Sequence, residues 1–388
     1  MNTKPFTTKT QGHRENPNHL KERVRNYSGF CVPVSLWWIL ISALLLTACG
    51  KEPMYQEQGY VFGTLVEVSV YGEDDAKARQ SVAAVMQEFQ RLHNMLHAWK
   101  PSELSELNAA FAQGKSKEAS PELVAMLKDA AQLSAQSENL FNPAIGGLVK
   151  LWGFHADEFK AVLPDEKQVA VLAKENPQMS DLVFSPARSP THSPSPGVIR
   201  EWVGSRNKAV QIDFGGYAKG YALDSAAALL KKMGVRNALI NIGGNVLAMG
   251  THGARSWRVG IQHPRKPGPL ATLELHDGEA IGTSGDYQRY FELDGKRYCH
   301  LIDPRNGQPV QGVQAVTILT HGGHAGVLSD AGSKPLFVSG AQGWRQAARK
   351  MQLEDALLID GAGKVHFTAA MQKRLEFTDK TVASEVEE

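Results

Sequence analysis

The chain has little cysteine and almost no surplus of charge. Only 3 of its 388 residues are cysteine, and 42 Lys and Arg residues face 40 Asp and Glu residues, for a net charge of +2. Three cysteines cannot build a disulfide framework, and this charge argues against a nucleic-acid binder that works through bulk charge. Hydrophobic residues make up 42% of the chain, enough for a large core in one elaborated domain or two. We expect a glycine-rich globular enzyme.

Several familiar cofactor and metal motifs are also missing. The glycines that follow Asp213 have neither the GxGxxG nor the Walker spacing, so neither a dinucleotide fingerprint nor a P-loop is supported. His93 and His97, like His321 and His324, are spaced as pairs that could bind zinc. No HExxH motif or third ligand accompanies either pair, which favours structural roles for these histidines.

The first 48 residues have the pattern of an export signal. Residues 1–30 are polar and basic, and a charge-free apolar stretch then runs from Cys31 to Ala48. Leu46-Thr47-Ala48-Cys49 resembles a bacterial lipoprotein box, in which the cysteine thiol takes a diacylglyceryl group and the cysteine becomes residue one. The alternative is an uncleaved anchor, but about eighteen residues is near the lower limit for a membrane span. We expect a signal peptide over 1–48 and a lipid anchor at Cys49.

Cleavage before Cys49 changes the charge balance. Residues 1–48 hold six basic and two acidic residues, so removing their net +4 leaves the mature chain at −2. Cys31 leaves with the signal and Cys49 is acylated, so Cys299 has no disulfide partner. We expect a protein that is held at the bacterial cell membrane by its lipid and faces the periplasm. Its expected parts are a tether over 49–59, a catalytic domain over 60–360, and a C-terminal hairpin and polar tail over 361–388.

The mature chain mixes strand and helix patterns without strict alternation, which predicts an α+β fold. Alternating apolar residues predict a strand over 61–71, and helical spacing predicts helices over 75–97 and from Ser120 onward. The Ser- and Pro-rich stretch 185–197 reads as a surface loop. Further strands are expected over 209–213, 238–242, 257–262, 271–276 and 315–320, helices over 217–233, 333–338 and 344–351, and hairpins at Asp294-Gly295 and Asp360-Gly361.

Four segments carry residues suited to catalysis or binding. In Ile212–Tyr221 two glycines and Lys219 at a helix start could hold phosphate, although glycine could also serve only the turn. Ile281–Tyr287 could bind a polar ligand or close its own turn. In Tyr298–Gly307, His300 could act as a general base or be structural. In Ser329–Val338, Asp330 and Ser333 could bind a hard cation, or Asp330 could cap a helix.

In this order the segments resemble the ApbE family of FAD:protein FMN transferases. The resemblance covers about Tyr60 to Leu358. The matching segments are Phe62–Thr64, Glu103–Asn108, Phe141–Phe154, Ile212–Asp224, Leu239–Gly244, Trp257–Pro264, Ile281–Tyr287, Tyr298–Pro309 and Ser329–Gly340.

This resemblance implies a fold, a reaction and a set of roles. The fold would be α+β, with a core like the tunnelling fold and an FAD cleft between lobes. The reaction would be Mg²⁺-dependent transfer of FMN from FAD to a Thr or Ser hydroxyl, with release of AMP. The acceptors would be subunits of Na⁺-translocating NADH:quinone reductase or related complexes. The implied positions are His300 as catalytic base, Phe62, Trp99, Leu140, Phe141, Asn142, Asp213, Lys219 and Ile302 for the flavin nucleotide, and Gly216, Asp330, Ser333 and Lys334 for Mg²⁺.

Three positions depart from the family pattern. Phe62 stands where Met is usual, Trp99 where Tyr is common, and Lys334 where a Thr metal ligand is expected. An ammonium group cannot ligate Mg²⁺, so Lys334 would have to point away from the metal or pair with the phosphates itself. Two alternatives therefore stay open, namely an FAD pyrophosphatase that gives free FMN and AMP, and a lipid-anchored flavin-binding protein without turnover.

Overall fold

A computed structural model describes residues 53–156, 158–186, 201–378 and 381–387. The predicted signal peptide, Cys49 and most of the Ser- and Pro-rich stretch lie outside these residues. Within them, no helix is long and apolar enough to cross a membrane. The description below concerns the compact unit formed by residues 52–388.

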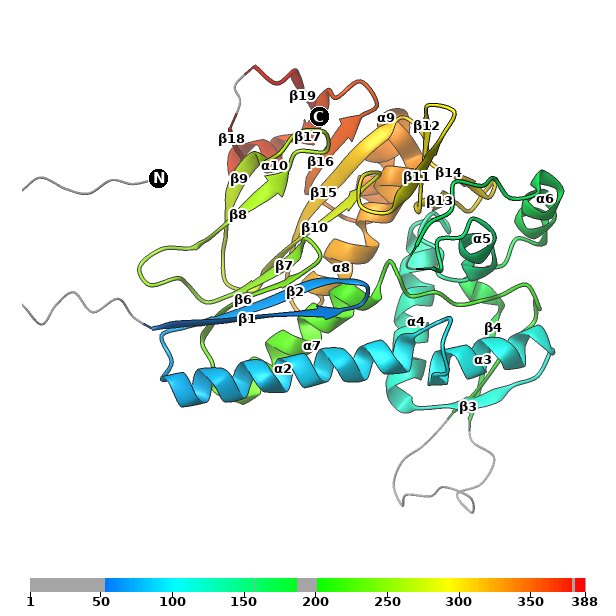
Figure 1. Cartoon of the computed structure of the whole chain (residues 1–388), viewed down its shortest axis with the longest axis horizontal. Coiled ribbons are helices and arrows are strands. Elements are labelled where there is room, and N and C mark those ends of the chain that lie inside the picture. Colours follow the sequence, from blue (N-terminus) through cyan, green and yellow to red (C-terminus); the bar gives the residue numbers. More distant parts are fainter. Residues whose placement is uncertain (1–52, 157, 187–200, 379–380, 388) are drawn as a thin grey trace, which may run out of the picture. The chain divides into compact units, whose positions relative to one another are not determined.

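A nine-stranded sheet forms the centre of this unit (Figure 1). Neighbouring strands run antiparallel, except for the parallel pair β17 (Val365–Thr368) and β19 (Ser384–Glu387). In sheet order the strands are β1 (Met54–Val61), β2 (Thr64–Tyr71), β6 (Asn237–Ile242), β7 (Asn245–Met249), β10 (Glu279–Gly285), β15 (Val313–His321), β16 (Asp355–Asp360), β17 (Val365–Thr368) and β19 (Ser384–Glu387).

The first two strands correct the expected boundary of the domain. Residues 54–59 were expected to be a tether, but they belong to β1, which pairs along its whole length with β2. Phe62 and Gly63 form the turn between the strands with φ angles of 56° and 70°. Glycine accepts this left-handed conformation readily, whereas a phenylalanine there is uncommon. The predicted strand over 61–71 is therefore the second half of a hairpin.

Helices cover one face of the sheet (Figure 1). The longest, α2 (Asp75–Leu96), confirms the predicted helix, and it is capped by Asp74, whose side chain accepts a hydrogen bond from the backbone N–H of Lys77. Its apolar face joins α7 (Ala218–Lys232) and the sheet in one core. The helices α8 (Ala325–Ala331) and α9 (Ser333–Lys350) complete this layer. The two segments predicted as helices over 333–338 and 344–351 both lie in α9, which is interrupted at Gly340, where φ is 67°.

Elements from the C-terminal region pack on the opposite face. A second core joins residues of β7, β15 and β16 to β8 (Trp257–Gln262) and β9 (Pro269–Leu275). The helix α10 (Ala369–Arg374) and the strand β18 (Glu376–Phe377) belong to the same layer. Met371 and Phe367 are buried there, so the expected polar tail is part of the fold.

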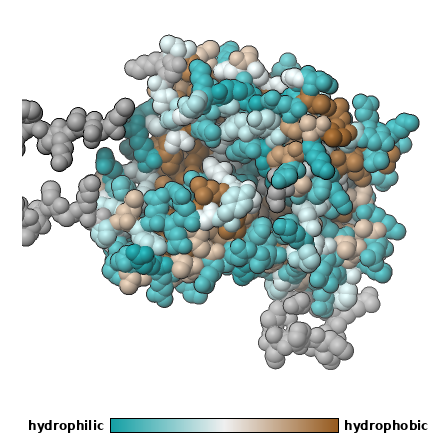
Figure 2. All heavy atoms as spheres, in the orientation of Figure 1, coloured by the Kyte–Doolittle hydropathy of each residue, from teal (hydrophilic) through white to brown (hydrophobic). Residues whose placement is uncertain are grey.

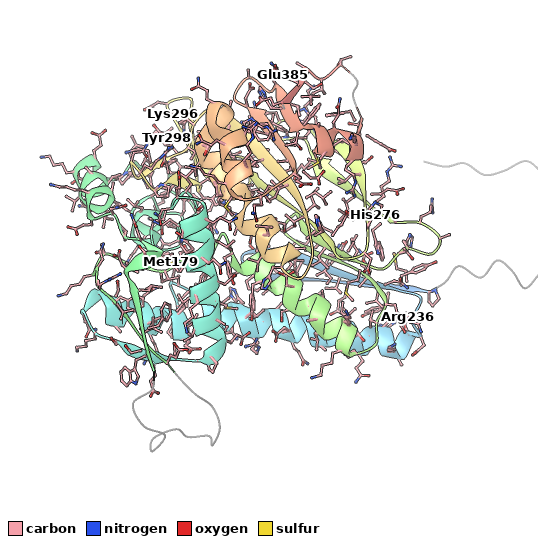
Figure 3. All side chains as sticks on the ribbon, turned by 180° about the vertical axis from the view of Figure 1, so that it is seen from behind. Met179, Arg236, His276, Lys296, Tyr298 and Glu385 are labelled. Carbon is pink, nitrogen blue, oxygen red and sulfur yellow. The ribbon has the colours of Figure 1, made fainter. Side chains whose placement is uncertain are left out.

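The remaining elements form a group that we call the second lobe. Ser120 caps α4 (Pro121–Gln136) as the sequence predicts, and its side chain accepts a hydrogen bond from the backbone N–H of Leu123. The Asp294-Gly295 pair forms the turn of the hairpin made by β11 (Tyr290–Leu293) and β12 (Lys296–Cys299), also as predicted. On that hairpin Lys296 lies over the ring of Tyr298 (Figure 3). The members are α3 (Glu103–Ala112), β3 (Lys117–Ala119), α4 (Pro121–Gln136), α5 (Gly146–Leu151), α6 (Glu166–Glu175), η1 (Met179–Asp181), β4 (Leu182–Pro186), β5 (Glu201–Ser205), β11 (Tyr290–Leu293), β12 (Lys296–Cys299), β13 (Ile302–Asp303) and β14 (Gln308–Pro309).

Candidate active site

A cleft of about 780 Å³ lies between the main sheet and the second lobe, and residues of both line it. The face in Figure 2 is mostly hydrophilic, with small groups of hydrophobic side chains among the polar ones. The cleft brings together residues from all four segments that the sequence singled out, and Lys334 and Val338 are the residues of the last segment that line it. The predicted site residues that line it are Phe62, Trp99, Leu140, Phe141, Asn142, Asp213, Gly216, Lys219, His300, Ile302 and Lys334.

Aromatic and apolar side chains line one part of the cleft. The turn conformation of Phe62 places its ring 6.3 Å from that of Phe89 and 5.7 Å from that of His93, between ring centroids. The ring of Trp99 lies 5.4 Å from His155, and both residues line the cleft. Flat aromatic faces of this kind suit stacking on a planar ring system.

Asn142 holds the loop before α5 rather than projecting freely into the cleft. Its amide nitrogen donates to the carbonyl oxygen of Pro177 at 2.8 Å, and its amide oxygen accepts from Ala144 N at 3.0 Å. The side chain is buried, so these two bonds satisfy groups that would be costly to leave unpaired. Its contribution to the cleft is therefore to shape the wall next to Phe141.

Asp213 begins the turn that leads into α7. The strand predicted over 209–213 does not form, and only an isolated bridge joins Gln211 to Ile145. Instead the buried amide of Asn108 pairs with Ile212, with its oxygen 2.7 Å from Ile212 N and its nitrogen 2.9 Å from Ile212 O. The Asp213 carboxylate accepts from Gly215 N at 2.8 Å, and burial raises its pKa. The turn thus presents Asp213 at the cleft edge.

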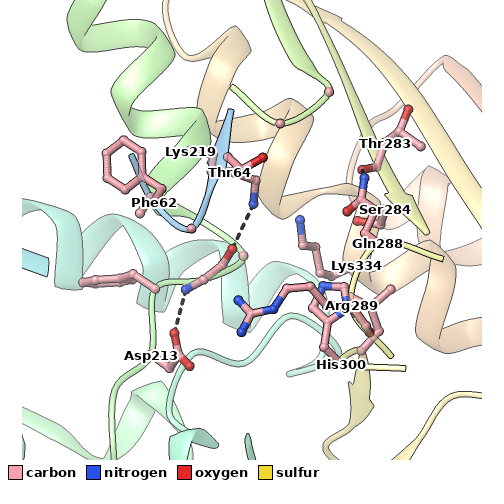
Figure 4. Close-up of a pocket in the computed structure, with 18 of the residues that line it drawn as sticks. Phe62, Thr64, Asp213, Lys219, Thr283, Ser284, Gln288, Arg289, His300 and Lys334 are labelled. Carbon is pink, nitrogen blue, oxygen red and sulfur yellow. Dashed lines mark hydrogen bonds between the residues drawn. The ribbon is translucent and has the colours of Figure 1, made fainter. Parts of the chain in front are cut away.

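Three cationic side chains meet at the other part of the cleft. Figure 4 shows Lys219, Lys334 and Arg289 directed into the same space from different elements. Lys219 donates to the carbonyl oxygen of Gly215 at 3.0 Å, and Arg289 donates to the carbonyl oxygen of Phe154 at 2.6 Å. Arg289 lies between the predicted segments Ile281–Tyr287 and Tyr298–Gly307 and was not predicted, and only the fold shows that its guanidinium faces the same cavity.

Asp330 lies behind these cations and is fully buried. Its Oδ1 accepts from Lys334 Nζ at 2.5 Å and lies 3.5 Å from Lys219 Nζ, while its Oδ2 accepts from the backbone N–H of Gly220 at 3.1 Å. Burial acts to raise the pKa of Asp330, but the charges of both lysines outweigh it and hold the pKa well below its usual range. The carboxylate is therefore ionised and fully engaged.

The proposed Mg²⁺ ligands do not fit a divalent cation in this arrangement. Ser333 donates to the carbonyl oxygen of Asp330 at 2.7 Å and also bonds Ser284 at 2.7 Å. A Cβ added at Gly216 would lie 3.0 Å from Lys334 Cε, so the aliphatic part of Lys334 lies along this glycine. No group of three or more His, Cys, Asp or Glu side chains able to hold a metal occurs in the described part of the chain.

His300 reaches the cleft just after β12. Its Nδ1 lies 3.2 Å from the carbonyl oxygen of Arg289. Burial, followed by the positive charges of Arg289 and Lys219, lowers the pKa of His300 to about 3. Its neighbour Cys299 is buried, and burial raises the pKa of that thiol to about 12. The geometry therefore offers a neutral imidazole as a base, without a thiol partner.

Together these features define a class of protein. An α+β fold holds a cleft with aromatic walls, a cluster of cations and a neutral imidazole, which suits a flat ligand that carries phosphate or diphosphate. A family model described as the ApbE family matches residues 62–358. The chain belongs to the ApbE family.

Individual relatives agree with this assignment. An FAD:protein FMN transferase of Rhodobacter capsulatus is 41% identical over 332 residues, which is 86% of this chain but 60% of that protein's length. A protein of the same name from Treponema pallidum is 30% identical over 349 residues, 86% of this chain and 92% of its own. The crystal structure of an ApbE protein from Thermotoga maritima has a TM-score of 0.71 and 26% identity, and the match covers 83% of this chain and 99% of that one. The expected α+β fold is thereby confirmed.

Proposed function

We propose that this protein transfers FMN from FAD to a hydroxyl group of a target protein and releases AMP. The observation that carries the proposal is the convergence of aromatic walls, cations and a neutral imidazole in one cleft. The name shared by the relatives, FAD:protein FMN transferase, supports the same reaction. In the proposed roles, the aromatic residues hold the rings of FAD and the cations hold its diphosphate.

The chemical step is a displacement at the phosphorus of the FMN half. The acceptor hydroxyl oxygen forms a bond to that phosphorus while the bond to the bridging oxygen breaks, and AMP carries that oxygen away. The hydroxyl proton passes to Nε2 of His300 and then to solvent. A hydroxyl group is a weak nucleophile at neutral pH, so such a base typically speeds the reaction by ~10²–10⁴-fold. The cations stabilise the charge on the phosphate oxygens.

The Mg²⁺ that the family resemblance implies has no step in this scheme. The ligand set that would hold it is occupied by hydrogen bonds and by the ammonium group of Lys334. The acceptors that we propose are subunits of Na⁺-translocating NADH:quinone reductase or related electron-transfer complexes. These proteins are expected to present a Thr or Ser hydroxyl to the open side of the cleft.

The reaction can be tested with the mature protein, FAD and such an acceptor subunit. We expect a covalently fluorescent acceptor band on a denaturing gel, together with one AMP for each flavin attached. Free FMN with no labelled acceptor would indicate a pyrophosphatase instead. Bound but unchanged FAD after long incubation would indicate a flavin-binding protein without turnover, and either result would refute the proposed transfer.

We also propose that the mature chain is a lipoprotein of the bacterial cell membrane that faces the periplasm. The apolar stretch and the lipoprotein box ending at Cys49 support this location. Palmitate labelling in cells should mark the wild-type protein, and the label should disappear in Cys49→Ser. A Cys49→Ser protein that is still labelled and still sediments with membranes would refute the lipid anchor.

A further inference from the structure

The ammonium group of Lys334 binds Asp330, one of the expected metal ligands. It donates to both the carboxylate and the backbone carbonyl oxygen of Asp330, at 2.5 Å and 2.8 Å. A divalent cation bound by Asp330 would need the same carboxylate as a ligand. The ammonium group of Lys334 therefore already makes the contact with this carboxylate that a metal would make.

We propose that Lys334 and Lys219 together replace the divalent cation in this chain, so that FAD binds and is neutralised without a metal. The inference rests on the proposed function for the identity of its substrate. Lys334 is 15% exposed and Lys219 is 23% exposed, whereas Asp330 beneath them is 0% exposed. The carboxylate thus holds the two ammonium groups from behind, and both lysines line the wall of the cleft.

The charges of the site suit a diphosphate without further cations. Lys219, Lys334 and Arg289 face Asp213 and Asp330, which leaves a surplus of one positive charge. The diphosphate of FAD carries about two negative charges, and charge-assisted hydrogen bonds from such cations are strong. A divalent ion placed beside Asp330 would be repelled by ammonium groups a few ångströms away. With the diphosphate bound, the site has a net charge of about −1 with the lysines alone, and a divalent ion added to them would change this to about +1.

The surrounding residues accommodate a lysine at this position. The Lys334 stem lies against Gly216, where a Cβ would approach Cδ and Cγ to 3.6 Å and 3.7 Å. Ser333, the next expected ligand, is 1% exposed and is fixed by Ser284 on one side and by the carbonyl oxygen of Asp330 on the other. The Ser333 hydroxyl thus has structural contacts in place of a metal contact.

The first test needs only the unaltered protein. FAD affinity, measured by quenching of flavin fluorescence, should differ by less than about twofold between EDTA and millimolar Mg²⁺, and FMN transfer should proceed in EDTA. A loss of more than about tenfold in either quantity on adding EDTA would overturn the inference. If FAD binds equally well in both buffers but no acceptor is ever labelled, the proposed transfer fails while metal-independent binding stands.

Variants of Lys334 give the second test. Lys334→Met keeps an unbranched stem but removes the charge, so FAD should bind roughly tenfold more weakly with or without Mg²⁺. Lys334→Thr supplies the hydroxyl usual in the family, and we expect weak FAD binding in EDTA that Mg²⁺ restores. Electron paramagnetic resonance of Mn²⁺ added together with FAD should show bound metal in the Lys334→Thr variant and no bound metal in the wild type.

A matched control is Lys174→Thr, which changes an exposed lysine of α6 outside the cleft. It should bind FAD like the wild type in both buffers. The metal rescue of Lys334→Thr also shows that this variant is folded. Tight Mn²⁺ binding by the wild type, or unchanged FAD affinity in Lys334→Met, would contradict the role given to Lys334.

Discussion

The Nδ1 atom of His300 lies 3.2 Å from the carbonyl oxygen of Arg289, while the backbone N–H of His300 donates to that same oxygen at 3.0 Å. A carbonyl oxygen only accepts hydrogen bonds, so Nδ1 must carry the proton of the neutral ring. Nε2 is then left without a proton and can accept one. Arg289 thus has two functions, since its backbone orients the base and its guanidinium lines the cleft.

The pH dependence of the reaction should reflect this environment. Since the pKa of His300 is lowered from 6.5 to about 3, its ring stays unprotonated throughout the neutral range, and only a much lower pH would remove the base. We expect kcat/KM for FAD to stay within about twofold between pH 5 and pH 8. A histidine with an ordinary pKa would instead lose about tenfold by pH 5.5. Such a loss, in protein shown to be folded at that pH, would contradict the lowered pKa.

Removal of the imidazole should separate chemistry from binding. In His300→Ala we expect FMN transfer to fall by ~10²–10⁴-fold, because the acceptor hydroxyl loses its base. The FAD dissociation constant should change by less than about threefold, since aromatic residues and cations supply most contacts. His300→Gln, which keeps a polar side chain but is no base, should be equally inactive. Wild-type rates in either variant would remove His300 from the proposed mechanism.

The sequence correctly predicted those helices, strands and turns whose formation depends on residues that are neighbours in the chain. The Asp294-Gly295 pair gave its hairpin, and β8 has the predicted bounds 257–262. The edge strand β1 was missed because its sequence, MYQEQGYV, is largely polar and only Val61 is buried. Residues 209–213 look like a strand, yet Ile212 finds its hydrogen bonds in the side chain of Asn108, 104 positions away. A hydrogen-bond partner so far away in the chain cannot be predicted from the residues next to Ile212.

The same distinction applies to the site. His300, Lys219 and Asp330 could be named from family motifs, and the structure brings these three residues together. Whether a metal or an ammonium group faces Asp330 could not be decided from the sequence, because Lys334 could have pointed away. In the structure Gly332 between α8 and α9 keeps helical angles, and Lys334 meets the carboxylate four residues earlier. The roles of the individual flavin contacts stay predictions.

Trp99 offers a test of the aromatic wall. Its indole is half-buried in the cleft beside His155, and stacking on a planar ring is worth about 1–3 kcal/mol. We therefore expect Trp99→Ala to weaken FAD binding about tenfold, as measured by quenching of flavin fluorescence. Trp202→Ala is the control, since Trp202 is 39% exposed on β5 and does not line the cleft. Equal affinities in the two variants would mean that Trp99 does not contact FAD.

The close contact between α7 and α8 should control both stability and the site. A Cβ at Gly220 would lie 2.3 Å from the carbonyl oxygen of Gly326, and the N–H of Gly220 donates to Asp330. Gly220→Ala must push the helices apart, so we expect a loss of about 2 kcal/mol or more in the free energy of unfolding. FAD binding should weaken as well, because Asp330 and its lysines would shift. Urea unfolding and flavin titration measure the two effects.

Gly323→Ala provides the matched comparison for this substitution. A Cβ at Gly323 meets no atom within 4 Å, and its backbone is not left-handed. Its unfolding free energy should stay within about 0.5 kcal/mol of the wild type, with FAD affinity unchanged. If Gly220→Ala were as stable as Gly323→Ala, the helices would have room to separate without cost. If it were destabilised but bound FAD normally, the position of Asp330 would not depend on the helix contact.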